Sequence, residues 1–124
     1  MNWNELPEFK GIDLQDSWVM SWRYSDSQLS FVLEASIWPG SEHYETPKVN
    51  AHTCYKPAKL IFEEVSGIKG LLRMSEVRPS LDPNGEKDFG NIEDLETKTN
   101  GFRISGEFGT VELVGGKMRF EVGT

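Results

Sequence analysis

The chain has 124 residues, of which 20 are acidic, 13 are basic and 37% are hydrophobic, and its formal net charge is −7. A chain of this length can bury the core of one domain without a disulfide or a metal, and its composition excludes a disordered chain, a fibrous repeat and a membrane span. The basic residues are scattered singly along the sequence, which argues against binding to DNA or RNA.

The first regular pattern lies within residues 17–37. Large side chains alternate with other residues at a period of two, which only a strand satisfies. These large side chains are Trp18, Met20, Trp22 and Tyr24. The same alternation runs from Leu29 to Ile37, after the turn residues 25–27. We therefore predict an antiparallel hairpin with one apolar face.

The pattern breaks over residues 38–57, where Pro and Gly recur. This connection is long for a compact domain, and long connections often carry function. It has room for a short strand within residues 48–55. Strand character returns at 60–65, Ser66-Gly67 predicts a turn, and residues 68–77 predict a return strand.

Turn residues fill positions 78–90, and the remaining sequence predicts a meander. Its strands are expected at residues 92–99, 102–108, 111–113 and 117–122. Ile92 and Leu95 also fit the spacing of a helix, but the Asn100-Gly101 hairpin signal favours a strand. Gly115-Gly116 predicts a two-residue hairpin before the last strand.

Together these elements predict a single all-β domain over residues 1–124. Its architecture is an antiparallel sandwich, an open barrel or a strongly curved sheet of about seven to eight strands. One cysteine cannot form an internal disulfide, and the residues after Met1 lack the basic and apolar stretches of a secretion signal. We therefore expect a cytoplasmic protein.

The candidate metal or catalytic residues are His43, His52 and Cys54. Zinc requires four protein ligands, or three and a water, and these residues lack such a spacing. The acidic segment from Asp82 to Glu93 has the ligand spacing of a calcium loop, but Lys87 stands where that loop requires glycine. We expect no catalytic residue, no metal and no cofactor.

Two sets of aromatic residues have different interpretations. The alternating set Trp18, Met20, Trp22 and Tyr24 predicts either core or, in an open barrel, the lining of an apolar cavity. Trp38 and Tyr44 lie at or within the long connection, where an aromatic side chain is more often a contact residue.

Two segments resemble small immunity-type proteins of bacterial polymorphic toxin systems and related β-rich domains. Residues 9–17 (Phe-Lys-Gly-Ile-Asp-Leu-Gln-Asp-Ser) resemble the opening of these proteins, and residues 101–106 with 109–113 resemble their final meander. Those proteins commonly carry His where this chain has Gln15. The resemblance implies stoichiometric binding to a toxin, which needs no catalytic residues.

We therefore predict a non-enzymatic binding protein, in the form of an immunity-like inhibitor, that recognises a basic toxin partner through an acidic surface. The predicted contact residues are Trp38, His43, Tyr44, Asp82, Glu86, Asp88, Glu93, Asp94 and Glu96. Two alternatives stay open. One is a small-molecule-binding open barrel or small enzyme, and the other is self-association through an exposed sheet edge at Gly115-Gly116.

Overall fold

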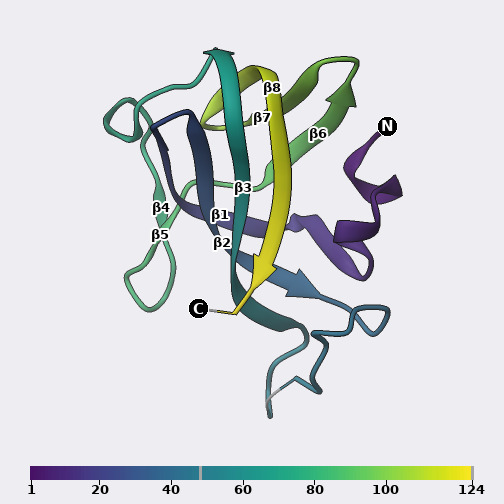
Figure 1. Ribbon diagram of the computed structural model, residues 1–124. Helices are drawn as coiled ribbons and strands as arrows, with labels where there is room; N and C mark the ends of the chain where they lie inside the picture. Colours follow the sequence, from purple (N-terminus) through teal and green to yellow (C-terminus); the bar gives the residue numbers. More distant parts are fainter. Residues whose placement is uncertain (48, 124) are drawn as a thin grey trace.

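A computed structural model describes residues 1–47 and 49–123 and confirms the predicted all-β fold. Six strands form one antiparallel sheet, and two short strands form a separate hairpin (Figure 1). The strands are β1 (Ile12–Ser25), β2 (Gln28–Ile37), β3 (Cys54–Lys69), β4 (Ser80–Leu81), β5 (Lys87–Asp88), β6 (Ile92–Lys98), β7 (Gly101–Gly106) and β8 (Gly109–Val122). Short 3-10 helices occur at η1 (Trp3–Glu5), η2 (Pro7–Phe9) and η3 (Met74–Glu76), and no α-helix occurs among the described residues.

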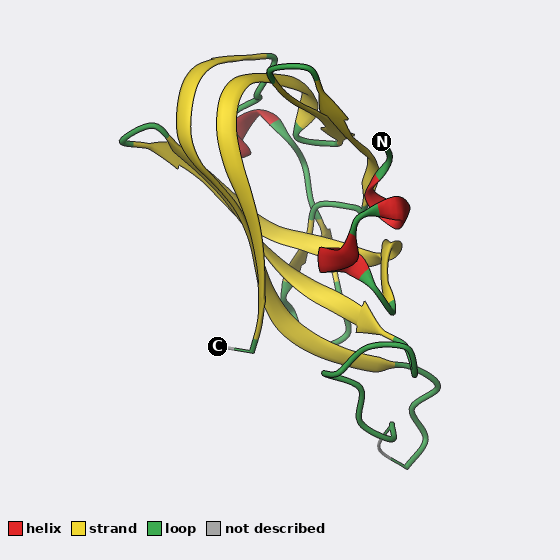
Figure 2. Cartoon of the chain, turned by 45° about the vertical axis from the view of Figure 1, so that its right-hand side comes forward, coloured by secondary structure: helices red, strands yellow, loops and turns green. Residues whose placement is uncertain are grey.

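The sheet is strongly curved, which was one of the three predicted architectures. Its strand order is β1-β2-β3-β8-β7-β6, and it curls into a half-barrel (Figure 2). The curl brings residues 89–90, which precede β6, next to β1 at the other end of the sheet. There the Val19 amide donates to the Gly90 carbonyl at 2.8 Å, and the Phe89 amide donates to the Val19 carbonyl at 2.9 Å. Residues that follow the β4–β5 hairpin are therefore attached to β1.

The curvature depends on a bend that β3 and β8 share. These strands stay paired from Ala58–Val122 to Lys69–Glu112, with a register shift between Val65 and Gly67. At the bend Gly115 has a φ of 72°, where a Cβ would lie 2.9 Å from the Ser66 hydroxyl oxygen. Glycine permits this backbone conformation at little cost. The turn-forming residues at both positions therefore bend continuous strands.

Four predictions in this region were wrong, because β3 and β8 continue through residues where turns were expected. Ser66-Gly67 and Gly115-Gly116 are not turns, because β3 and β8 run through them. The return strand predicted at 68–77 is absent, since β3 ends at Lys69 and η3 follows. No sheet edge exists at Gly115-Gly116, because β8 lies between β3 and β7.

Most of the other predicted strands are confirmed. The hairpin of β1 and β2 forms as expected, although β1 begins earlier, at Ile12. Residues Ile92–Lys98 are a strand and not a helix, and the turn before β7 lies at Thr99-Asn100, one residue earlier than predicted, because Gly101 already pairs with Lys98. No separate strand forms within residues 49–53, and β3 begins at Cys54, near the end of the segment 48–55 in which a short strand was expected. Lys48 lies outside the described residues.

The expected aromatic face of β1 does not form, because the strand carries a bulge at Met20. The register shifts between Val19, which pairs with Leu33, and Ser21, which pairs with Val32. This extra residue reverses the alternation, so Val19 and Trp22 face inward whereas Trp18 lies opposite Glu34 on the outer face.

The inner face of the sheet holds the hydrophobic core. Trp22 belongs to this core: it is 6% exposed, and its indole N–H donates to the Leu72 carbonyl at 2.8 Å. Its ring packs against Phe89 and Phe108, with centroids 5.0 and 6.0 Å away. Tyr24, in contrast, is 38% exposed. The predicted set is therefore divided between core and surface.

The segment that resembles immunity proteins forms a wide bulge at the start of β1, where residues 14–17 lie opposite Ala35 alone. The Ser17 hydroxyl accepts the Ser36 amide at 2.8 Å and donates to the Asp13 carbonyl at 2.6 Å. Both serines are buried. These bonds fix the bulge to β2 and place Asp16 on the outer face, where its carboxylate accepts from Ser36.

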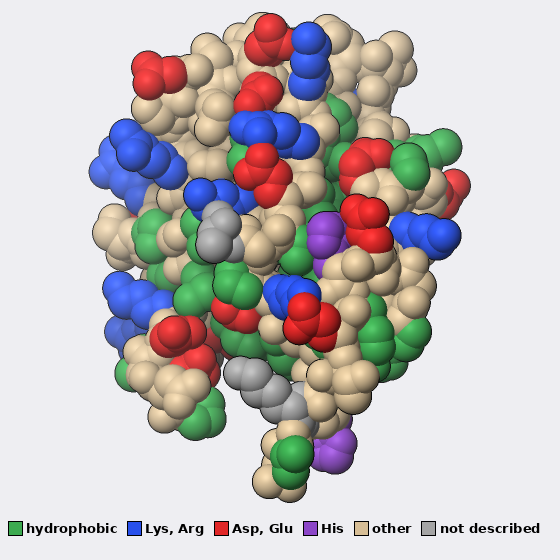
Figure 3. Space-filling view, turned by 60° about the horizontal axis from the view of Figure 1, so that its bottom comes forward, with side chains coloured by type: hydrophobic (Ala, Val, Ile, Leu, Met, Phe, Trp, Pro, Cys, Tyr) green, Lys and Arg blue, Asp and Glu red, His purple; other side chains and the backbone are tan. Residues whose placement is uncertain are grey.

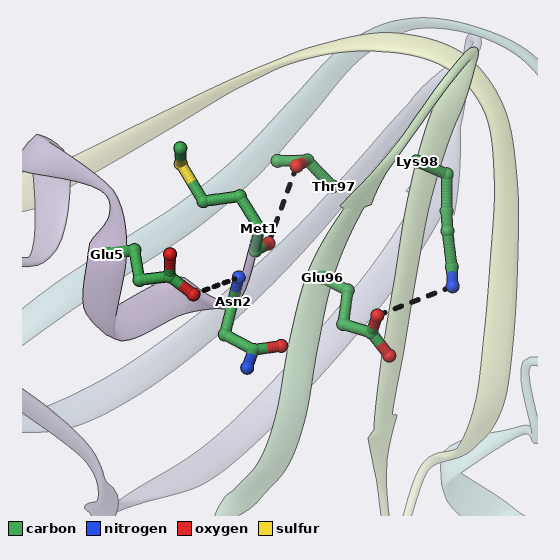
Figure 4. Close-up of polar contacts among 6 residues, drawn as sticks. All are labelled: Met1, Asn2, Glu5, Glu96, Thr97 and Lys98. Carbon is green, nitrogen blue, oxygen red and sulfur yellow. Dashed lines mark hydrogen bonds and ion pairs between the residues drawn. The ribbon is translucent and has the colours of Figure 1, made fainter.

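The N-terminal residues cover the outer edge of β6. The Thr97 amide donates to the Met1 carbonyl at 2.9 Å, and Asn2 forms an isolated antiparallel bridge with Glu96. The Thr97 hydroxyl donates to the same Met1 carbonyl at 3.4 Å (Figure 4). Farther along, Phe9 is buried, and its ring packs against Phe120 with centroids 5.0 Å apart. This segment therefore closes the open side of the half-barrel.

Candidate functional site

An open groove of about 450 Å³ lies on the outer face of the sheet, between the β1–β2 hairpin and the β4–β5 hairpin. Its lining residues are Trp18, Glu34, Asp82, Pro83, Asn84, Glu86 and Asp88. We call this feature the acidic groove. In a view of the lower end of the molecule, acidic and basic side chains lie next to each other at the lower left (Figure 3).

Two independent structures hold the groove walls in place. Trp18 and Glu34 lie directly opposite each other in the β1–β2 ladder, so their side chains share the outer face. On the hairpin, the Asp82 carboxylate accepts the backbone amides of Asn84 and Glu86 at 2.9 and 2.8 Å. The Asp88 carboxylate accepts the Gly90 amide at 2.7 Å, next to the contact with β1.

The groove concentrates negative charge that no lysine or arginine of the described residues neutralises through an ion pair. None of its four carboxylates takes part in an ion pair with another described residue. Burial raises the pKa of the Glu34 carboxyl above 4.5, and the nearby Glu86 and Asp82 raise it further. On the neighbouring strands, in contrast, Glu63 pairs with Arg119 at 2.6 Å and Glu64 pairs with Lys117 at 2.9 Å.

Trp18 forms the aromatic wall of the groove. Its indole nitrogen is buried and has no hydrogen-bond partner among the described residues. The ring packs against Tyr55, with centroids 5.0 Å apart and planes tilted by 59°. A negatively charged groove beside an indole face suits a cation, because carboxylates pair with the cation and the ring attracts it through its π-system.

A chain of hydrogen bonds continues from this wall along the outer face. The Tyr55 hydroxyl donates to the Asp16 carboxylate at 3.2 Å, and the Ser36 hydroxyl donates to the same carboxylate at 2.9 Å. The Trp38 indole N–H donates to the Ser36 hydroxyl at 2.9 Å. Burial, together with the Asp16 charge and hydrogen bond, raises the pKa of Tyr55, so the phenol stays protonated as a donor.

This chain ends at a small pocket of about 100 Å³ beneath the long connection between β2 and β3. We call it the loop pocket. Its lining is mostly apolar and consists of Ile37, Trp38, Pro39, Tyr44, Pro47, His52, Thr53 and Cys54. Cys54 is a free, buried cysteine.

The predicted contact residues fall into separate groups. Asp82, Glu86 and Asp88 line the acidic groove, and Trp38 and Tyr44 line the loop pocket. Glu93, Asp94 and Glu96 lie on β6 and line neither feature. Glu96 is bonded to Lys98 at 3.4 Å, and this hydrogen bond is the main reason that its pKa is lowered (Figure 4).

His43 lies at a different cavity, with a volume of about 510 Å³. Its neighbours there include Glu8, Lys10 and Glu42, and the His43 imidazole lies 3.4 Å from the Glu42 carboxylate. This cavity therefore presents both signs of charge, and it lacks the aromatic wall of the acidic groove.

The sequence did not single out Glu34, Asp16 or Tyr55 as site residues. Glu34 occupies a polar position in a regular strand, and nothing in its neighbourhood along the chain indicates the β4–β5 hairpin that faces it. Asp16 had a partial signal, since it lies in the segment that resembles immunity proteins. The pairing of Tyr55 with Ser36 depends on the register between β2 and β3.

Within residues 1–47 and 49–123, no three His, Cys, Asp or Glu side chains come together as they would around a metal ion. His43 is thus not joined to His52 and Cys54, although the last two line the loop pocket together. No helix in the described part of the chain is long and apolar enough to cross a membrane.

No protein-family model, curated protein or solved structure matches the chain.

Proposed function

We propose that the protein is a non-enzymatic binding protein that holds a basic segment of a protein partner in the acidic groove. One observation carries the proposal: four carboxylates that make no ion pair with another described residue line the groove beside Trp18, whereas Glu63 and Glu64 on the neighbouring strand β3 pair with arginine and lysine. An arginine side chain suits such a groove, because its planar guanidinium pairs with carboxylates and stacks on an indole. Long-range attraction between opposite charges would also accelerate encounter.

The resemblance to immunity-type proteins supports a narrower form of this proposal, in which the partner is a basic toxin domain and binding inhibits it. Within the resembling segment, Asp16 and Ser17 form hydrogen bonds to Ser36, and these bonds hold the outer face next to the groove in place. A cytoplasmic setting fits the single free cysteine. In this form the protein and its partner associate one to one.

The test is a titration with an acetylated, amidated hexa-arginine peptide, followed through the NMR signals of the four tryptophan indole N–H groups. We expect the Trp18 signal to shift saturably, and the shift to weaken as salt screens the charges. The Trp22 signal should stay in place, because that indole is bonded within the core. A triple variant, E34Q/D82N/E86Q, should bind the peptide at least about tenfold more weakly.

A second triple variant separates the position of the charges from the net charge. E8Q/E93Q/E107Q removes three exposed carboxylates that lie outside the groove and make no ion pair with another described residue. It changes the net charge by the same amount as the groove variant. We expect it to bind hexa-arginine nearly as well as the native protein. Equal losses in the two variants, or an unmoved Trp18 signal, would show that the groove is not the binding site.

A further inference from the structure

The acidic groove lies beside β2 at Glu34, and the loop pocket lies at the end of the same strand, where Trp38 and the buried Ile37 and Cys54 line it. Side chains two apart in a strand point to the same side, so Glu34, Ser36 and Trp38 form a row along the outer face of β2 and its end. Glu34 lines the groove and Trp38 lines the pocket. Ser36, between them, bonds to the Trp38 indole and to Asp16.

The surface that joins the two features is aromatic and exposed. Trp38 is 48% exposed and Tyr55 is 39% exposed. Both side chains are held by the Asp16 and Ser36 hydrogen bonds, so they are ordered before a partner arrives. Ordered, exposed aromatic side chains supply large contact area with little loss of side-chain entropy, which is typical of binding surfaces.

The loop pocket has the size of an anchor site and not of a small-molecule site. Its volume of about 100 Å³ is below the range of roughly 300–1,000 Å³ that is usual for small-molecule sites. Its mostly apolar lining suits one aliphatic side chain of a larger partner. The pocket therefore offers an apolar contact in addition to the charge that the groove offers.

From this arrangement we infer that the partner segment is extended and presents an arginine to the acidic groove and an aliphatic side chain, four residues away, to the loop pocket. The spacing follows from β2, because Glu34 and Trp38 are separated by four residues, or about 13 Å at the rise of a strand. An extended peptide has the same rise, and its residues i and i+4 point to one side. The inference rests on the proposed function and specifies its partner.

The test compares pentapeptides of identical composition, all acetylated and amidated. Arg-Gly-Ser-Gly-Leu and its reverse, Leu-Gly-Ser-Gly-Arg, have the required spacing, whereas Gly-Ser-Gly-Arg-Leu has the two side chains adjacent. We expect one of the spaced peptides to shift the Trp18 and Trp38 indole signals together and to bind at least about tenfold more tightly than the adjacent peptide, because two joined contacts reinforce each other.

Variants locate the second contact. W38A removes one wall of the loop pocket and, since Trp38 is half exposed, leaves the core intact. It should abolish the advantage of the spaced peptide over the adjacent peptide. Y24A is the matched control, because Tyr24 is also an exposed aromatic residue but lies near the β1–β2 turn, and it should preserve the advantage.

The outcomes distinguish this inference from the proposed function. If hexa-arginine binds at Trp18 but spaced and adjacent peptides bind equally well, the inference is wrong and the proposed function stands. The same holds if W38A retains the preference for a spaced peptide. If hexa-arginine does not bind at Trp18, both the proposed function and the inference that rests on it are wrong.

Discussion

At the scale of single residues, Glu34 connects the stability of the protein with its proposed binding role. Its carboxyl is partly buried and faces Glu86 and Asp82, which together raise its pKa above the ordinary value of 4.5. Because the folded protein holds this proton more tightly than the unfolded chain does, the free energy of unfolding falls as pH rises through the interval between the two pKa values. At neutral pH the Glu34 carboxyl is charged, and the free energy of unfolding is lowered by the full cost of that charge.

We therefore expect E34Q to melt at a higher temperature than the native protein at pH 7, with a gain below about 1 kcal/mol because the site is open to solvent. The gain should vanish below about pH 4, where the native carboxyl is also uncharged. E93Q is the control, since Glu93 is exposed and outside the groove, and it should change little. A lower melting temperature for E34Q at pH 7 would show that the charge has stabilising contacts within the fold.

At the scale of elements, the shared bend of β3 and β8 determines the shape of the sheet. Gly115 has a φ of 72° in the middle of a strand, and a Cβ there would meet the Ser66 hydroxyl at 2.9 Å. G115A should therefore cost about 1–2 kcal/mol and lower the melting temperature by several degrees. G40A is the control: a Cβ at Gly40 would have its nearest contact at 3.7 Å, so we expect almost no change. A harmless G115A would mean that the bend does not depend on glycine.

The same elements show what the sequence could predict. Alternation identified the β1–β2 hairpin because each apolar side chain has a fixed face within an uninterrupted strand. It placed Trp18 and Trp22 on one face because the bulge at Met20, between them, is invisible in a pattern of large residues, and one extra residue puts the side chains before and after it on opposite faces. It also took Gly115-Gly116 for a hairpin, since the conformations that favour glycine in a turn also favour it in a sharply bent strand.

At the scale of the whole molecule, the candidate site depends on contacts between distant parts of the chain. The acids of residues 82–88 were predicted contact residues, but their relation to Trp18 and Glu34 exists only because the curled sheet brings residues 89–90 to β1. Composition revealed the acidic character of the segment. It could not reveal which acids are neutralised, because Glu96 meets Lys98 on β6 whereas Asp82 meets Glu34 across the groove.

The curled sheet also leaves β6 as an edge strand, which the N-terminal residues cover through the bond from the Thr97 amide to the Met1 carbonyl. An uncovered edge offers unpaired backbone groups to another chain. A variant that lacks residues 2–6 but keeps Pro7–Phe9, and thus the packing of Phe9 on Phe120, should expose this edge. We expect it to associate with rising concentration at 0.15 M salt, so that light scattering reports a mass increasing from about 14 kDa toward that of a dimer.

The control for this prediction uses the direction of the Thr97 amide. Because this N–H points toward Met1 and away from β7, adding T97P to the shortened chain removes the donor at the open edge without removing a bond of the β6–β7 ladder. The doubly changed protein should remain a monomer, whereas the shortened chain with Thr97 should not. If the shortened chain stays folded and monomeric at millimolar concentration, the curvature and the net charge of −7 suffice to keep the edge of β6 from pairing, and the N-terminal cover is not required.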